Sequence, residues 1–206
     1  MSKETSTTAS TTYLKLYNTL SLILWSILTI RITYTFTKHG NVGIFEHNHV
    51  QTRNTQLLAL LEIAHALIGI VKAPLLPVTF QVGGRLAVVA LLESQYGHRI
   101  MADSRLGQVH QAAFYAMVIA WSYADIIRFS YFLSSKDTHG WLTWFRYSAF
   151  VLLYPVGLTT EAWIVYFGAV KQAQSPVWVV TAWIWLGLYV PGEYLSCRDR
   201  WLRRLT

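Results

Sequence analysis

The sequence predicts an all-α membrane protein, a polytopic bundle of about six transmembrane helices. Hydrophobic residues make up 53% of the 206 residues and charged residues only 13%, and the mean hydropathy is +0.34. A soluble domain of this length needs more polar surface than this composition provides. The apolar residues also fall into blocks of roughly 17 to 24, the length that a helix needs to cross a bilayer.

Six apolar blocks are the expected membrane spans. They cover residues 14–36, 57–73, 75–92, 112–132, 144–167 and 177–195. Pro74 and Pro77 separate the second block from the third. Because proline disrupts a helix interior, we expect a tight turn there, either in a helical hairpin or within one long broken element. The polar segment 37–56 is expected to be a solvated loop, and its His39, His47 and His49 are not expected to bind metal.

The chain is expected to form one domain between two tails. A polar, disordered N-terminal tail covers 1–12, the six-helix transmembrane domain covers 13–196, and a basic C-terminal tail covers 197–206. The first apolar run is too long for the core of a cleavable signal peptide. An even number of spans puts both termini on one side, and that side carries more Lys and Arg. The positive-inside rule therefore predicts cytosolic termini.

The net charge of +7 does not indicate a nucleic-acid partner. The basic residues are scattered, and their only cluster, at 198–204, directly follows the last apolar block. Such a juxtamembrane cluster is typical of a surface that faces anionic lipid. The only cysteine is Cys197, so intramolecular disulfides and thiolate metal sites are excluded.

Ionisable side chains lie within the predicted spans. They are Arg31, Glu62, His65, Arg85, Asp125, Arg128, Arg146 and Glu161. An isolated charge at the bilayer centre costs about 2.5 to 3.5 kcal/mol on insertion scales, so these groups are expected to turn inward and pair. Asp125 and Arg128 are spaced i,i+3 and can neutralise each other, while Glu62 and His65 share one face of the second span. Whether these pairs only hold helices together or also act on a ligand stays open.

The fifth block carries the strongest candidate site. Tyr147, Tyr154 and Glu161 recur every seven residues and so share one helical face. In a regular helix Tyr154 and Glu161 are separated by about 10.5 Å along the axis, a distance that a substrate can span. Pro155 is expected to kink the segment, and Gly157 to allow close approach of another helix.

Motifs along nearly the whole chain resemble the 3-hydroxyacyl-CoA dehydratase family of the endoplasmic reticulum, also called the protein tyrosine phosphatase-like family. They are YLKLYN at 13–18 with Trp25, LEIAH at 61–65 with Gly69, QVGGR at 81–85, WS at 121–122, IIRF at 126–129, RY at 146–147 with Phe150, LYPVG at 153–157 with Glu161, and PG at 191–192. They occur in the family's order, and their joint specificity is high.

The resemblance implies removal of water from a (3R)-3-hydroxyacyl-CoA to give a trans-2-enoyl-CoA, the third step of very-long-chain fatty acid elongation. The family's proposed catalytic pair, a Tyr and a Glu, falls on Tyr154 and Glu161. A weakly acidic C2 proton needs a base and the departing 3-hydroxyl needs an acid, so this pair could act without a cofactor or a metal. Which residue is the acid and which the base stays open.

Further residues are expected to support this pair or bind substrate. A cation must stabilise a phenolate if Tyr154 acts as the base, and Arg85, Arg128 and Arg146 are the candidates. Tyr147, Gly157, Glu62 and His65 complete the supporting set. The expected partners are the acyl-CoA substrate, membrane lipid and other fatty acid elongation enzymes, in the endoplasmic reticulum membrane.

Some positions depart from the family pattern. Asp125 stands where the family usually has Glu, and the C-terminus lacks the familiar dilysine-type retrieval signal. Three alternatives therefore stay open. They are a divergent paralogue that acts on a 3-hydroxyacyl or polyketide-like chain in specialised metabolism, a non-catalytic membrane scaffold, and a small transporter or channel.

Overall fold

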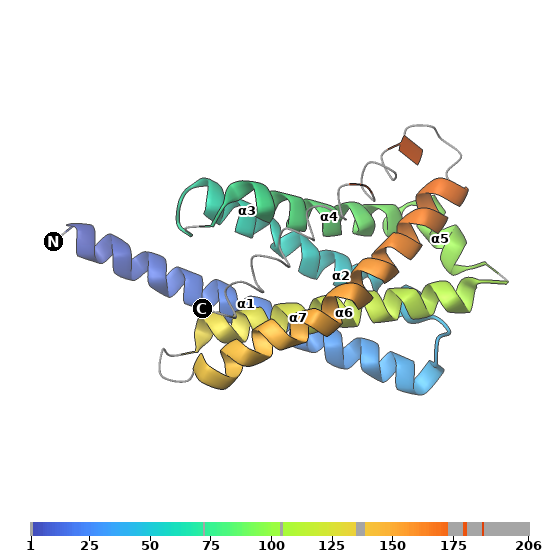
Figure 1. Cartoon of the computed structure of the whole chain (residues 1–206), viewed down its shortest axis with the longest axis horizontal. Helices are drawn as coiled ribbons and strands as arrows, with labels where there is room; N and C mark the ends of the chain where they lie inside the picture. The colour runs from blue at the N-terminus through green and yellow to red at the C-terminus, as the bar shows by residue number, and fades with distance from the viewer. Residues whose placement is uncertain are drawn as a thin grey trace.

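A computed structural model describes residues 2–71, 73–103, 105–134, 139–172, 179–180 and 187. The regular elements within these ranges are all helical (Figure 1), which confirms the predicted all-α class. They are α1 (Ser2–His39), α2 (Ile44–Leu58), α3 (Leu60–Leu67), α4 (Leu75–Glu93), α5 (Gln95–Met101), α6 (Gly107–Leu133), α7 (His139–Val165) and the π-helical segment η2 (Tyr166–Gln172).

Four helical segments of the described chain are long and apolar enough to cross a membrane. They cover Thr11–His39, Leu75–Glu93, Gly107–Leu133 and Val151–Lys171. The predicted count of about six spans is not confirmed. The block at 57–73 is divided between the end of α2 and the short α3, and the block at 177–195 lies almost wholly outside the described residues.

The prediction of a loop over 37–56 was wrong, because α2 begins at Ile44. Its buried face is mainly polar, with Asn48, Thr52, Thr55 and Gln56 each at most 3% exposed. These positions follow helical spacing. A helix that buries polar side chains has no apolar stripe, so its hydropathy resembles that of a loop.

The turn predicted around the two prolines is present between α3 and α4. Gly69 has a φ of 73°, in the left-handed region that glycine adopts without a steric penalty. Pro74 is the N-cap of α4, and Pro77 lies in the first helical turn, where its missing N–H breaks no helical hydrogen bond. Helix α3 ends at Leu67, two residues before Gly69.

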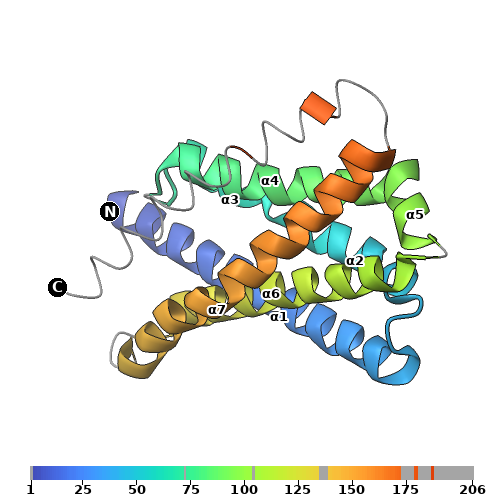
Figure 2. The ribbon, with the colours of Figure 1, turned by 45° about the vertical axis from the view of Figure 1, so that its right-hand side comes forward.

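Helix α6 lies at the centre of the bundle and packs most extensively on α7 and α1 (Figures 1 and 2). Its inward face buries Phe114, Met117 and Val118, each at most 1% exposed. Leu28 of α1 and Ile164 of α7 are fully buried in the same cluster. In lipid such close packing, rather than exclusion of water, holds apolar helices together.

Asp103 organises the chain just before α6. Its Oδ1 accepts the backbone N–H groups of Arg105 and Leu106 at 2.7 and 2.8 Å. These two hydrogen bonds lower the pKa of the Asp103 carboxyl below its usual value, and the bond from Leu106 has the larger effect. The side chain thus satisfies donors at the start of the helix that have no partner within it.

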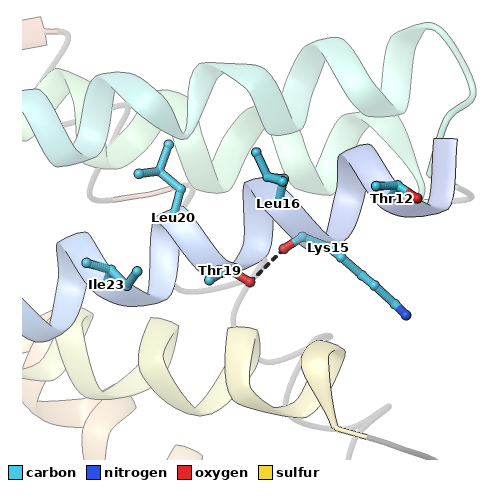
Figure 3. A pocket seen from close by; sticks show the side chains of 6 residues that line it. All are labelled: Thr12, Lys15, Leu16, Thr19, Leu20 and Ile23. Carbon is cyan, nitrogen blue, oxygen red and sulfur yellow. Dashed lines mark hydrogen bonds between the residues drawn. The ribbon is translucent and has the colours of Figure 1, made fainter. Parts of the chain in front are cut away.

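Helix α1 presents an apolar outer face. A hollow of about 390 Å³ lies along this helix. Its lining side chains are Thr12, Lys15, Leu16, Thr19, Leu20 and Ile23 (Figure 3). Leu16 is 70% exposed. A face of this kind is what a lipid-contacting helix needs.

Helix α1 begins at Ser2, so it includes most of the segment 1–12 for which a disordered tail is predicted. The division into two tails and one membrane domain stays a prediction. The basic C-terminal tail and Cys197 lie outside the described residues.

Candidate active site

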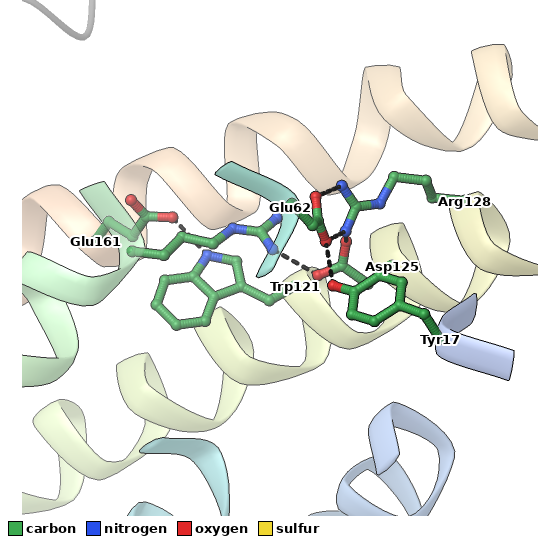
Figure 4. A network of polar contacts seen from close by, with 7 residues as sticks. Tyr17, Glu62, Trp121, Asp125, Arg128 and Glu161 are labelled. Atoms are coloured by element: carbon green, nitrogen blue, oxygen red, sulfur yellow. Dashed lines mark hydrogen bonds and ion pairs between the residues drawn. The ribbon is translucent and has the colours of Figure 1, made fainter. Parts of the chain in front are cut away.

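A network of ion pairs joins α3, α4 and α6 in the interior (Figure 4). The two terminal nitrogens of Arg128 donate to the two carboxylate oxygens of Glu62, each at 2.6 Å. One of these nitrogens also lies 2.9 Å from Asp125 Oδ1. Asp125 Oδ2 accepts from Arg85 at 2.6 Å. We call Glu62, Arg128, Asp125 and Arg85 the charge ladder.

The charge ladder contains two acids and two arginines, so its formal charges balance. Asp125 is the deepest member, with a side chain 3% exposed, and it separates the two guanidinium groups. Each charge that leaves water therefore gains an oppositely charged neighbour and charge-assisted hydrogen bonds. The predicted pairing of Asp125 with Arg128 is confirmed.

Helix α1 contributes two tyrosines beside the ladder. The Tyr17 hydroxyl donates to Glu62 Oε1 at 3.4 Å. The Tyr13 hydroxyl is hydrogen-bonded to His65 Nε2 at 2.9 Å, and the His65 ring is 4% exposed. Tyr17 contacts both side chains of α3, because its ring also packs edge-on against the His65 ring, with centroids 4.8 Å apart.

Glu161 of α7 lies at the other end of the ladder. Its carboxylate Oε1 accepts the indole N–H of Trp121 at 2.6 Å, and the two residues are 6% and 2% exposed. The Arg85 guanidinium lies over the Trp121 ring, 5.3 Å from the ring centroid. Figure 4 shows Glu161, Trp121 and the ladder along one line.

Gly157 has the predicted position at a close helix contact. A Cβ atom there would lie 3.8 Å from the Ala120 side chain and 4.0 Å from Glu161 Oε1. These are ordinary contact distances, so a single methyl group fits here, whereas a larger side chain would extend toward α6 and the Glu161 carboxylate.

Helices α6 and α7 run antiparallel. Trp121 contacts Glu161 of α7, whereas His110, earlier in α6, contacts the ring of Phe167 in η2, which follows α7. Tyr154 precedes Glu161 by about two helical turns, or about 10.5 Å in a regular helix. Gly157 lies beside Ala120, so Tyr154, less than one turn before Gly157, lies level with the part of α6 just after Ala120.

Tyr154 itself is half-buried, and its hydroxyl oxygen is shielded from solvent. Helix α7 is continuous through Pro155. The side chains of Arg146 and Tyr147 lie outside the described residues. The structure thus brings Glu161 and Arg85 to one indole ring, while a shared pocket for Tyr154 and Glu161 stays a prediction.

The described part of the chain contains no group of three or more His, Cys, Asp or Glu side chains that could hold a metal ion. His49 is instead paired with Glu93, with Nδ1 and Oε1 2.7 Å apart. His47 Nδ1 lies 2.6 Å from the Gly43 carbonyl oxygen.

Sequence reasoning did not single out Trp121, Tyr13 or Tyr17 as site residues. Trp121 is neither charged nor in the fifth block, and it entered only through the motif at 121–122. Tyr13 and Tyr17 have i,i+4 spacing, which predicts a shared face. Their partners on α3 are 52 and 45 residues away, beyond the reach of any local pattern.

Comparison with known proteins identifies similar chains. The family described as "Protein tyrosine phosphatase-like protein, PTPLA" matches residues 56–200. A probable very-long-chain (3R)-3-hydroxyacyl-CoA dehydratase of Schizosaccharomyces pombe is 31% identical over 190 residues, covering 89% of this chain and 86% of the relative. The dehydratase PASTICCINO 2 of Arabidopsis thaliana is 31% identical, covering 88% and 86%. PASTICCINO 2B of rice is 29% identical, covering 75% and 67%. No solved structure matches.

Proposed function

Because the chain belongs to the protein tyrosine phosphatase-like family, PTPLA, we propose that it is a hydro-lyase that converts a (3R)-3-hydroxyacyl-CoA into a trans-2-enoyl-CoA. Relatives whose names state this activity cover most of the chain. The observation that carries the proposal is the buried Glu161 carboxylate, hydrogen-bonded to Trp121, on the same helix as Tyr154.

The reaction breaks two bonds of the substrate. A base takes the proton from C2, the electron pair of that C–H bond forms the C2–C3 double bond, and the 3-hydroxyl leaves as water after receiving a proton from an acid. Tyr154 and Glu161 each exchange one proton in this scheme, so no cofactor is required. Because C2 and C3 are adjacent, the two side chains must converge on one bond of the substrate, each within hydrogen-bonding reach of the proton it exchanges.

Arg85 is the cation best placed to assist. Negative charge develops on the thioester oxygen as the C2 proton leaves, and a guanidinium group can stabilise it. Both terminal nitrogens of Arg128 contact carboxylates. The described contacts of Arg85 are Asp125, through one terminal nitrogen, and the Trp121 ring. We assign Arg128, Glu62 and Asp125 to holding the helices in register.

The substrate has a charged CoA group and an apolar acyl chain. We propose that the acyl chain enters the bundle from the bilayer while the CoA group stays in water on the cytosolic side. The proposed location is the endoplasmic reticulum membrane, with both termini in the cytosol and with other elongation enzymes as partners. The proposal includes six membrane spans and tail arginines that face anionic lipid on the cytosolic side.

The test supplies (3R)-3-hydroxyacyl-CoA substrates of graded chain length to membranes that contain the protein, and follows the products by mass spectrometry. The proposal predicts trans-2-enoyl-CoA products and a preferred chain length. No turnover at any length would contradict it. A scaffold is then distinguished by binding of elongation enzymes without turnover, and a transporter by uptake of a labelled solute into proteoliposomes. Turnover of a polyketide-like thioester in preference to fatty acyl-CoA would favour specialised metabolism.

A further inference from the structure

Trp121 makes two contacts through different parts of one side chain. The edge of its indole donates the N–H to Glu161 Oε1 at 2.6 Å, and its face lies 5.3 Å from the Arg85 guanidinium. The side chain is 2% exposed, and it links the Glu161 carboxyl of α7 to the charge ladder (Figure 4).

The chemistry of indole makes the contact with Glu161 directional. An indole N–H donates a hydrogen bond and accepts none. Oε1 of Glu161 therefore acts as an acceptor whether the carboxyl group is ionised or protonated. Because the carbonyl oxygen of a carboxyl group is a better acceptor than its hydroxyl oxygen, this contact favours Oε2 as the atom that carries the proton.

The surroundings hold the indole in place. The Arg85 guanidinium that lies over the ring is fixed in turn by Asp125 at 2.6 Å. Gly157 of α7 also lies beside Ala120 of α6, the residue next to Trp121. A donor on a packed helix, fixed by its neighbours, is the arrangement that precise positioning of a reacting group requires.

We propose that Trp121 is a positioning residue for the acid–base step: it fixes the rotamer of Glu161 and assigns proton exchange to Oε2, which it directs toward the substrate. This inference rests on the proposed function. In this role Trp121 touches neither the substrate nor the transferred proton. The feature needed to position Glu161 is the indole N–H and not the bulk of the ring.

The test compares Trp121→Phe with Trp25→Phe. Both substitutions remove an indole from a buried tryptophan, since Trp25 of α1 is 3% exposed in the same core. We expect Trp121→Phe to lower kcat roughly 10- to 100-fold, the range for losing a hydrogen bond to a charged group, with KM unchanged. The pH dependence of kcat should also change. Trp25→Phe should keep the wild-type kcat and pH dependence.

A second replacement keeps the shape of the ring. Incorporation of 3-benzothienylalanine at position 121 replaces the N–H by sulfur, so packing against Arg85 is retained while the donor is lost. We expect the same loss of kcat as in Trp121→Phe. This measurement decides the matter if the phenylalanine variant does not accumulate in folded form.

Wild-type kcat and pH dependence in the benzothienyl protein would overturn the role of Trp121 and leave the proposed function intact. Absence of dehydration by the wild-type protein would instead contradict the proposed function and, with it, this inference. The two failures are therefore distinguishable.

Discussion

Arg128 of α6 and Glu62 of α3 form a two-point ion pair in which each terminal guanidinium nitrogen lies 2.6 Å from a carboxylate oxygen. The pair joins positions 66 residues apart, and its side chains are 24% and 16% exposed. Such fork-to-fork geometry fixes both distance and orientation between two helices. We therefore assign it to the architecture that supports the site.

Removing one partner of this pair should destabilise the protein. Glu62→Ala leaves Arg128 with Asp125 alone, and we expect a loss of about 3 kcal/mol, the lower end of the range for breaking a buried pair because both side chains are partly exposed. Thermal unfolding in detergent measures the loss. Arg53→Ala is the control, because the Arg53 side chain is 40% exposed in its pair with Glu93 and should contribute less than about 1 kcal/mol. Equal effects of the two substitutions would contradict this assignment.

Gly157 should tolerate one methyl group but not a branched side chain. A Cβ at this position meets Ala120 and Glu161 at ordinary contact distances, 3.8 and 4.0 Å. Gly157→Ala should therefore retain turnover and gain up to about 1 kcal/mol in helix propensity. Gly157→Val adds atoms where α6 and Glu161 lie, and we expect kcat to fall by about 100-fold, as for misplacement of a catalytic group by about 1 Å. Dehydration assays on both variants check this, and equal rates would refute the close-approach role.

Asp103 should make stability depend on acid pH. The pKa of its carboxyl is lower in the folded protein than in the unfolded chain. The stabilisation is therefore complete above the pKa of the unfolded chain, about 4, and is lost as pH falls through the lower pKa of the folded protein. Asp103→Ala should lower Tm at neutral pH, and the difference from wild type should shrink as pH falls below about 4. Asp103→Asn, which keeps the Oδ1 acceptor, is the matched control. A Tm difference independent of pH would argue against the assigned hydrogen bonds.

The sequence predicted best the features that depend on local pattern. Long apolar runs identified α1, α4, α6 and α7, because a helix in lipid must bury its backbone polar groups within itself. The i,i+3 spacing of Asp125 and Arg128 predicted their contact correctly, since a helix brings such positions together.

The misses have two physical origins. Helix α2 buries Asn48, Thr52 and Gln56, so its pattern is polar where a hydropathy argument expects apolar residues. The partners of Glu62 and Glu161 belong to another helix, 66 and 40 residues away. No spacing rule within one segment relates such positions, and only the packing of α6 brings them together.

The central claim, that Tyr154 and Glu161 perform the acid–base chemistry, is tested most directly by kcat for dehydration of a (3R)-3-hydroxyacyl-CoA in wild type, Tyr154→Phe and Glu161→Gln. Both substitutions preserve side-chain size while removing the exchangeable proton, so unfolding temperatures should stay close to wild type. We predict that each lowers kcat by about 100- to 10,000-fold, the contribution typical of a positioned acid or base. Turnover within a few-fold of wild type in either variant, with protein of normal stability, would contradict the account.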